Sequence, residues 1–220
     1  MSRLPTLAAV AGLLLAAAAC GGAPRVDFET TASEPPYETV DEWAGYRRLP
    51  PPEVGDVAFV DHAVDPPVEY HPVASDDGLL LVYFGYLSCP DVCPTTLADV
   101  GKALSLLPAE EAARIEVAMV TVDPERDEGA EIARYLDVFV DRYHALVAPD
   151  DAALAEAAEA FGVRYEIEPH EPGDTDYEVG HTATLFVVDD EGRIVWEFGF
   201  GTAREDLADT LAGILAARYP

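Results

Sequence analysis

Residues 79–97 read LLLVYFGYLSCPDVCPTTL, and this stretch decides the fold. Its first part, Leu79 to Phe84, is a continuous apolar run, as expected of a central strand that is buried on both faces. Gly85 ends the run, and two cysteines, Cys89 and Cys93, follow it four residues apart. A buried strand that delivers two thiols to a strand-to-helix turn indicates a functional site rather than packing.

Strands and helices alternate on both sides of this stretch, which predicts an α/β fold with a mixed central sheet flanked by helices. The first two expected strands form an N-terminal β-hairpin extension, and Asp189-Asp190-Glu191-Gly192 marks a second hairpin near the C-terminus. Extended segments are expected at 57–60, 68–73, 79–84, 115–122, 145–148, 163–167, 184–188 and 193–198. Helices are expected at 94–107, 129–140, 152–161 and 203–218.

The N-terminus has the composition of an export signal, expected over residues 1–19, with an apolar run from Leu7 to Ala19. Cys20 follows small residues, as at a lipoprotein cleavage site, which would make it the lipid-carrying first residue. Ordinary signal cleavage and an uncleaved anchor are the alternatives. Residues 20–53 are rich in Pro and Glu and are expected to form an extended tether. The folded domain is then expected over residues 54–220.

The chain is strongly acidic, with a formal net charge of −29, and Lys102 is its only lysine. Such a surface repels phosphate backbones, which argues against a nucleic-acid role. It attracts cations and basic partner surfaces, although a solubility device is the simpler explanation of the overall charge. The charge therefore excludes one class of partner without identifying the function.

The two thiols favour redox or metal chemistry. Exported cysteine pairs tend to oxidise, and a chain with one possible disulfide is not a disulfide scaffold. Thiolates four residues apart can hold one soft ion such as Cu(I) or Zn²⁺ from the same side, with a third ligand from elsewhere. Cys93 lies near a helix N-terminus, which favours the thiolate, whereas Asp91 disfavours it and attracts a cation.

His181 is the candidate third ligand among five histidines. It immediately precedes the strand expected at 184–188, in a segment that carries a cis-proline facing the cysteine turn in thioredoxin-like proteins. Residues 182 and 183 are not proline here, so a histidine at this point would face Cys89 and Cys93. A purely structural histidine is the alternative. The other four histidines are expected to be solvated surface residues: His62, His71, His144 and His170.

Three motifs together resemble the Sco/SenC family of copper-binding assembly proteins. They are YFGYLSCPDVCPTTL at 83–97, VTVDPERD at 120–127 and VGHTATLFVVDDEGR at 179–193, and the resemblance covers about 54–211. It implies a thioredoxin-like fold on a membrane-tethered domain facing the periplasm or intermembrane space. It also implies that Cys89, Cys93 and His181 bind copper as Cu(I), with Cu(II) as a second state that the site can hold.

The family resemblance further implies a partner, subunit II of cytochrome c oxidase, whose CuA centre the protein would help to assemble. Copper delivery is one implied role. Thiol–disulfide reduction of the subunit's cysteines, with Cys89 and Cys93 as catalytic residues, is the alternative, so enzyme activity stays open. A peroxidase and a passive copper buffer or sensor are further alternatives. Other periplasmic copper chaperones or thiol reductants are expected as additional partners, at the outer face of the cytoplasmic membrane.

Two details of the motifs qualify the resemblance. Gly180 stands where the family has an aspartate before the histidine, which removes a possible carboxylate partner of the imidazole. The Asp123-Pro124-x-x-Asp127 segment matches the family and is expected to be a structural turn with an acidic partner surface, without a ligand role.

Overall fold

The sheet is built around the central apolar run. In the computed structural model, which describes residues 37–219, the run forms β5 (Leu79–Gly85), and all seven of its residues are buried. β6 (Ile115–Thr121) pairs with one edge of β5 in parallel, and β10 (Leu185–Val188) pairs with the other edge in antiparallel orientation. Because this strand is covered on both faces and both edges, its sequence is apolar without alternation.

The main sheet has seven strands in the order β11-β10-β5-β6-β7-β3-β4. β5, β6 and β7 run parallel, whereas β3, β4, β10 and β11 pair with their neighbours in antiparallel orientation, so the predicted mixed sheet is confirmed. The remaining bounds are β3 (Phe59–Asp61), β4 (Val68–Tyr70), β7 (Tyr143–Val147) and β11 (Ile194–Phe198). Two short antiparallel pairs lie outside it: β1 (Tyr37–Glu38) with β2 (Arg47–Arg48), and β8 (Tyr165–Ile167) with β9 (Val179–His181).

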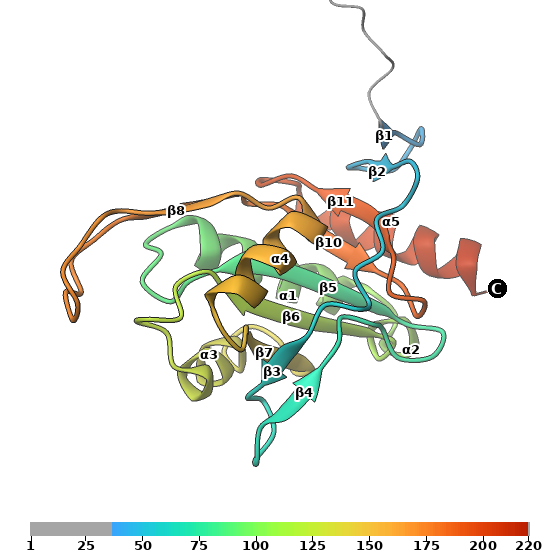
Figure 1. Ribbon diagram of the computed structural model, residues 1–220. Coiled ribbons are helices and arrows are strands. Elements are labelled where there is room, and N and C mark those ends of the chain that lie inside the picture. The colour runs from blue at the N-terminus through green and yellow to red at the C-terminus, as the bar shows by residue number, and fades with distance from the viewer. Residues whose placement is uncertain (1–36, 220) are drawn as a thin grey trace, which may run out of the picture. The chain divides into compact units, whose positions relative to one another are not determined.

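Helices cover both faces of the sheet (Figure 1). α1 (Val92–Leu106) packs against α5 (Arg204–Arg218) on one face, and α4 (Asp151–Phe161) lies on the opposite face. α4 has clear end signals: the Asp150 side chain accepts a hydrogen bond from the N–H of Ala153, and Gly162 ends the helix at φ +76°. The other helices are α2 (Ala109–Ala112) and α3 (Gly129–Leu136).

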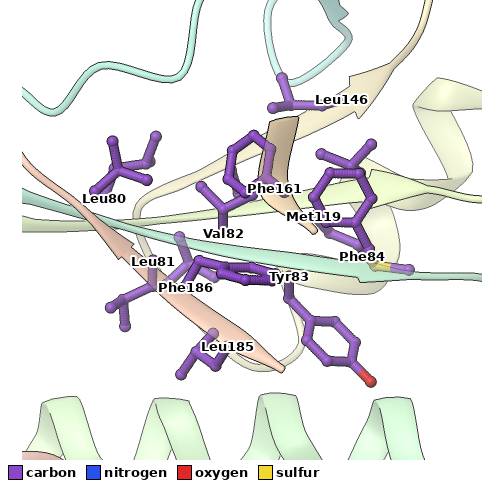
Figure 2. Close-up of a cluster of buried hydrophobic side chains, with 14 of the residues drawn as sticks. Leu80, Leu81, Val82, Tyr83, Phe84, Met119, Leu146, Phe161, Leu185 and Phe186 are labelled. Atoms are coloured by element: carbon purple, nitrogen blue, oxygen red, sulfur yellow. The ribbon is translucent and has the colours of Figure 1, made fainter. Parts of the chain in front are cut away.

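Successive side chains of β5 point alternately toward the helices on the two faces of the sheet. Figure 2 shows Val82 and Phe84 on the side of Phe161, a residue of α4, whereas Tyr83 points away from Phe161. The Phe84 and Phe161 rings meet edge to face with their centroids 5.1 Å apart. β5 therefore contributes aromatic packing to one layer and places a tyrosine on the face that also carries the cysteine turn.

Both predicted hairpins are confirmed. β3 and β4 pair in antiparallel orientation, with Phe59 opposite Tyr70, and β10 pairs with β11 across the turn at 189–192. Gly192 supplies the positive φ of +72° that this turn requires. The pairing of β8 with β9 was not predicted, because each strand has only three residues.

Residues 37–53 pack on the folded domain, so the expected domain start at Val54 is wrong for this part of the tether. The Trp43 ring meets Trp196 edge to face at 5.3 Å, and Tyr46 exchanges two backbone hydrogen bonds with Glu197. These contacts come from isolated residues in a Pro-rich segment, so the sequence has no hydrophobic periodicity there that would predict them. The expected export signal, Cys20 and the earlier part of the tether lie outside the described residues.

No helix among the described residues 37–219 is long and apolar enough to cross a membrane.

Candidate metal centre

The cysteine turn lies between β5 and α1. Cys89 is partly exposed in the turn, where its N–H donates to the carbonyl of Tyr86 at 3.3 Å. Cys93 is the second residue of α1 and is buried. Its N–H donates to the sulfur of Cys89 at 3.3 Å. Both thiols are free, and the backbone of the helix start already orients one of them.

His181 reaches the same place from β9. Its Nε2 lies 3.5 Å from Cys93 Sγ, although the two residues are 88 positions apart in sequence. Its Nδ1 lies 3.1 Å from the carbonyl oxygen of Thr182. A carbonyl can only accept, so this contact places the proton on Nδ1 and leaves the lone pair of Nε2 directed toward the cysteines.

The structure thus brings together the three residues that the sequence singled out. One sulfur each from Cys89 and Cys93 and one nitrogen of His181 all lie within 4.8 Å of one another. Within residues 37–219 no other group of three or more Cys, His, Asp or Glu side chains meets this criterion. Two thiols and an imidazole are donors that suit a soft or borderline ion, so the donor set fits copper better than a hard cation.

Burial controls protonation at this site. It raises the pKa of the Cys93 thiol to about 12, and a hydrogen bond with Cys89 adds to this effect. The helix N-terminus therefore does not produce a thiolate here without a bound cation, contrary to the sequence-based expectation. Burial also lowers the pKa of His181, which keeps the imidazole neutral and available as a ligand at neutral pH.

Two tyrosines enclose the imidazole. The Tyr83 and Tyr86 rings meet His181 edge to face, with centroids 5.9 Å and 5.8 Å away. The Tyr83 hydroxyl donates to Cys93 Sγ at 3.7 Å, and burial raises the pKa of Tyr83, so the hydroxyl keeps its proton. Tyr83 was not predicted as a site residue because it lies inside the apolar run.

The Asp123–Asp127 turn is hydrogen-bonded to the backbone of the cysteine turn. Asp127 Oδ2 accepts hydrogen bonds from the N–H of Leu87 at 3.0 Å and from the hydroxyl of Thr121 at 2.7 Å. Asp123 is fully buried and binds Arg126, while Asp127 is only 4% exposed. The prediction of a structural turn is therefore confirmed, but the acidic partner surface predicted with it is wrong for these two carboxylates, because both are buried.

Arg126 connects this turn to the arm 168–178, which joins β8 to β9 and projects from the sheet in Figure 1. Its Nη1 donates to the carbonyls of Thr175 and Tyr177, each at 3.0 Å. Its guanidinium lies 3.6 Å from the centre of the Tyr177 ring, which stacks on His170 at 3.7 Å. The strand that carries His181 is thereby held against the turn that supports the cysteines.

Gly180 does not leave the imidazole without an orienting group. A Cβ at this position would meet nothing within 4 Å, and the Nδ1 of His181 is directed to the Thr182 carbonyl. The backbone therefore replaces the carboxylate expected from the family pattern.

The prediction that four histidines are solvated surface residues holds only for His71. His144 lies in β7, and its Nδ1 is 2.8 Å from the buried carboxylate of Asp61. The His62 ring packs on Gly129, where a Cβ would approach it to 2.1 Å. These roles were missed because their partners are distant in sequence.

Comparisons with known proteins agree with the predicted fold and family. The family model described as SCO1/SenC matches residues 73–216, more than half of the chain. "Protein SCO2 homolog, mitochondrial" of Mus musculus is 30% identical over 165 residues, which are 74% of this chain and 62% of that protein. The chain therefore spans less than two thirds of this relative's length.

Two solved structures extend the match to the whole fold. The solution structure of apo Sco1 from Thermus thermophilus is 36% identical, with a TM-score of 0.63 over 80% of this chain and 96% of that one. The structure of Bradyrhizobium japonicum ScoI with copper bound is 29% identical, with a TM-score of 0.59 over 73% of this chain and 98% of that one. These matches confirm the predicted thioredoxin-like fold class, and the chain belongs to the SCO1/SenC family.

Proposed function

We propose that the protein is a copper metallochaperone that holds copper through Cys89, Cys93 and His181. The observation that carries this proposal is the convergence of two sulfurs and one nitrogen within 4.8 Å at the end of β5. Soft thiolates favour Cu(I), and the imidazole also accommodates Cu(II). The copper bound in the structure of Bradyrhizobium japonicum ScoI supports the choice of metal.

The role as a chaperone requires that the ion can leave. Cys89 is partly exposed, and His181 lines a groove of about 780 Å³ beside α4. At least the Cys89 sulfur belongs to a residue that ligands from another protein can approach, unlike the donors of a closed structural zinc site. The acceptor in this proposal is the CuA domain of cytochrome c oxidase subunit II, and Sco proteins are described as cytochrome c oxidase assembly proteins.

A Cu(I) competition titration with a chromophoric chelator tests the site. Cys89→Ser, Cys93→Ser and His181→Ala are expected to weaken binding by about tenfold or more, because each removes one of three donors. His71→Ala, which changes an exposed histidine, is the matched control and should bind as the wild type does. If His181→Ala binds copper like the wild type, the three-ligand site is wrong.

The free thiol pair also favours a second function, reduction of the cysteines of subunit II. In that reaction the Cys89 thiolate attacks a partner disulfide, forms a mixed disulfide and releases one partner thiolate. Cys93 then attacks the Cys89 sulfur, which releases the second partner thiolate and leaves a Cys89–Cys93 disulfide. Two electrons pass to the partner, and an external thiol reductant must restore the pair.

Incubation with apo-subunit II separates the two functions. Copper transfer from the loaded protein to the reduced partner supports the chaperone. Disulfide reduction in the oxidised partner by the metal-free protein supports the reductase. His181→Ala should impair only the first reaction, since the second needs only the two thiols.

We further propose that the domain is exported and is anchored at the outer face of the cytoplasmic membrane through a lipid on Cys20. The support is the composition of residues 1–20. Metabolic labelling with a lipid precursor should modify the wild type and fail to modify Cys20→Ser. Labelling of both chains, or of neither, would contradict this assignment.

A further inference from the structure

We propose that Tyr83 is a positioning residue that ties Cys93 to His181 and tunes the donor strength of the Cys93 sulfur. This inference rests on the copper-binding role proposed above. Tyr83 differs from the three proposed ligands because it offers no atom to the ion and acts only through two of them.

The contacts of Tyr83 join two segments that are distant in sequence. Its hydroxyl donates to Cys93 Sγ at 3.7 Å, and the edge-to-face contact of its ring with His181 has an interplanar angle of 80°. Tyr83 is fully buried and lies within β5, all seven residues of which are buried. Its side chain therefore has little freedom, and both neighbours are held in a fixed relation to it.

The lack of a side chain at Gly85 leaves room for the contact between Tyr83 and Cys93. A Cβ at Gly85 would lie 2.9 Å from Cε1 of Tyr83 and 3.0 Å from Cys93 Sγ. The first distance is shorter than real Cβ contacts and the second is unusually tight, so a side chain at this position would displace the ring and the sulfur. Residues 83 and 85 share one face of β5 because side chains alternate along a strand.

A hydrogen bond to a sulfur ligand withdraws electron density from it. In metal–thiolate centres, hydrogen bonds around the cysteine sulfur tune the redox potential, and outer partners of the ligands commonly contribute tenfold or more to affinity. In the metal-free protein the same hydrogen bond favours the dithiol over the disulfide, since a disulfide sulfur is the poorer acceptor. Loss of the hydroxyl should therefore make the Cys89–Cys93 disulfide harder to reduce.

The test uses Tyr83→Phe, which keeps the ring and removes one hydroxyl. The sulfur-to-Cu(II) charge-transfer band is expected to move to longer wavelength, because the sulfur becomes the stronger donor. Cu(I) affinity is expected to fall by about tenfold, because Cys93 loses the contact that positions it beside His181. The equilibrium constant for reduction of the metal-free disulfide by dithiothreitol should fall by about fivefold, as expected for one hydrogen bond. Tyr70→Phe, a half-buried tyrosine of β4 far along the sheet, is the control and should change none of these values.

A second arm keeps the Tyr83 hydroxyl and makes it more acidic. Tyr86→Phe removes the other tyrosine hydroxyl beside the thiols, and in this variant made with 3-fluorotyrosine the band should move to shorter wavelength than in Tyr86→Phe with ordinary tyrosine, opposite to the effect of Tyr83→Phe. An unchanged band and an unchanged dithiothreitol equilibrium in Tyr83→Phe would overturn the proposal. Because the dithiothreitol equilibrium needs no copper, this result is distinct from failure of the copper site itself, which the His181→Ala titration reports.

Discussion

At the scale of single residues, burial outweighs the helix terminus at Cys93. The helix start lowers the cost of a thiolate, but the side chain has no exposed surface and its pKa rises to about 12. Sequence alone identifies Cys89 and Cys93 as candidates by their type and spacing, and His181 by its place just before the strand expected at 184–188. It cannot identify Tyr83, since a tyrosine within an apolar run is indistinguishable from core packing until its neighbours are known.

Gly85→Ala is expected to disturb the site without removing any donor. The added methyl would push against Tyr83 and Cys93, at a cost of about 1–3 kcal/mol in the free energy of unfolding. Cu(I) affinity should fall with it, because the sulfur must move. Urea unfolding and the chelator titration measure both effects. Gly180→Ala is the matched control, since a Cβ there meets nothing within 4 Å, and equal behaviour of the two variants would contradict the argument.

His144→Ala is expected to destabilise the fold by about 3 kcal/mol, because it leaves the Asp61 carboxylate buried without its side-chain partner. Burial alone would raise the pKa of Asp61, but the hydrogen bonds from His144, Ala63 and Ala145 together lower it. The pair thus stabilises the protein above the unfolded pKa of 3.8 and loses this contribution as pH falls. Urea unfolding at pH 7 and pH 3 should show a smaller effect of His144→Ala at pH 3, because acid removes in the wild type the contribution that the variant already lacks. His71→Ala, on an exposed histidine, should match the wild type.

At the scale of elements, the long signals in the sequence predict well and the short ones do not. β5, α1 and the β10–β11 hairpin follow from an apolar run, a helical periodicity and a turn motif within one local segment. The β8–β9 pair and its arm depend instead on Arg126, which lies 49 and 51 residues from the carbonyls that it binds. No window of local sequence contains that information.

The Asp123–Asp127 turn is expected to make stability depend on pH. Burial raises the pKa of Asp127 to about 6 from an unfolded value of 3.8. A folded-state pKa above the unfolded value stabilises the protein fully below pH 3.8, and this contribution is lost as pH rises through 6. Urea unfolding between pH 4 and pH 7 should show this loss in the wild type and a flatter profile in Asp127→Asn. The exposed Asp76 supplies the control, Asp76→Asn, and identical profiles for wild type and Asp127→Asn would refute the assignment.

At the scale of the whole molecule, residues 37–53 belong to the fold. Trp43→Ala is expected to lower the free energy of unfolding by about 3 kcal/mol, because Trp196, 1% exposed, would lose its ring partner. A chain of residues 54–220 should be destabilised further, since it also lacks the backbone pairing of Tyr46 with Glu197. Urea unfolding of the Trp43→Ala variant and of the 54–220 chain, each compared with residues 34–220, measures these losses in the free energy of unfolding. A tether without a structural role would leave all three chains equally stable.

The 88-residue separation between Cys93 and His181 has a consequence for chain entropy. An ion held by both residues cross-links the polypeptide and closes a long loop, which restricts the unfolded chain far more than the folded one. Loaded protein should therefore unfold less readily than protein that has delivered its ion. Each time the protein delivers its ion, it would return to the less stable metal-free form. The lifetime of the folded domain would therefore depend on the supply of metal.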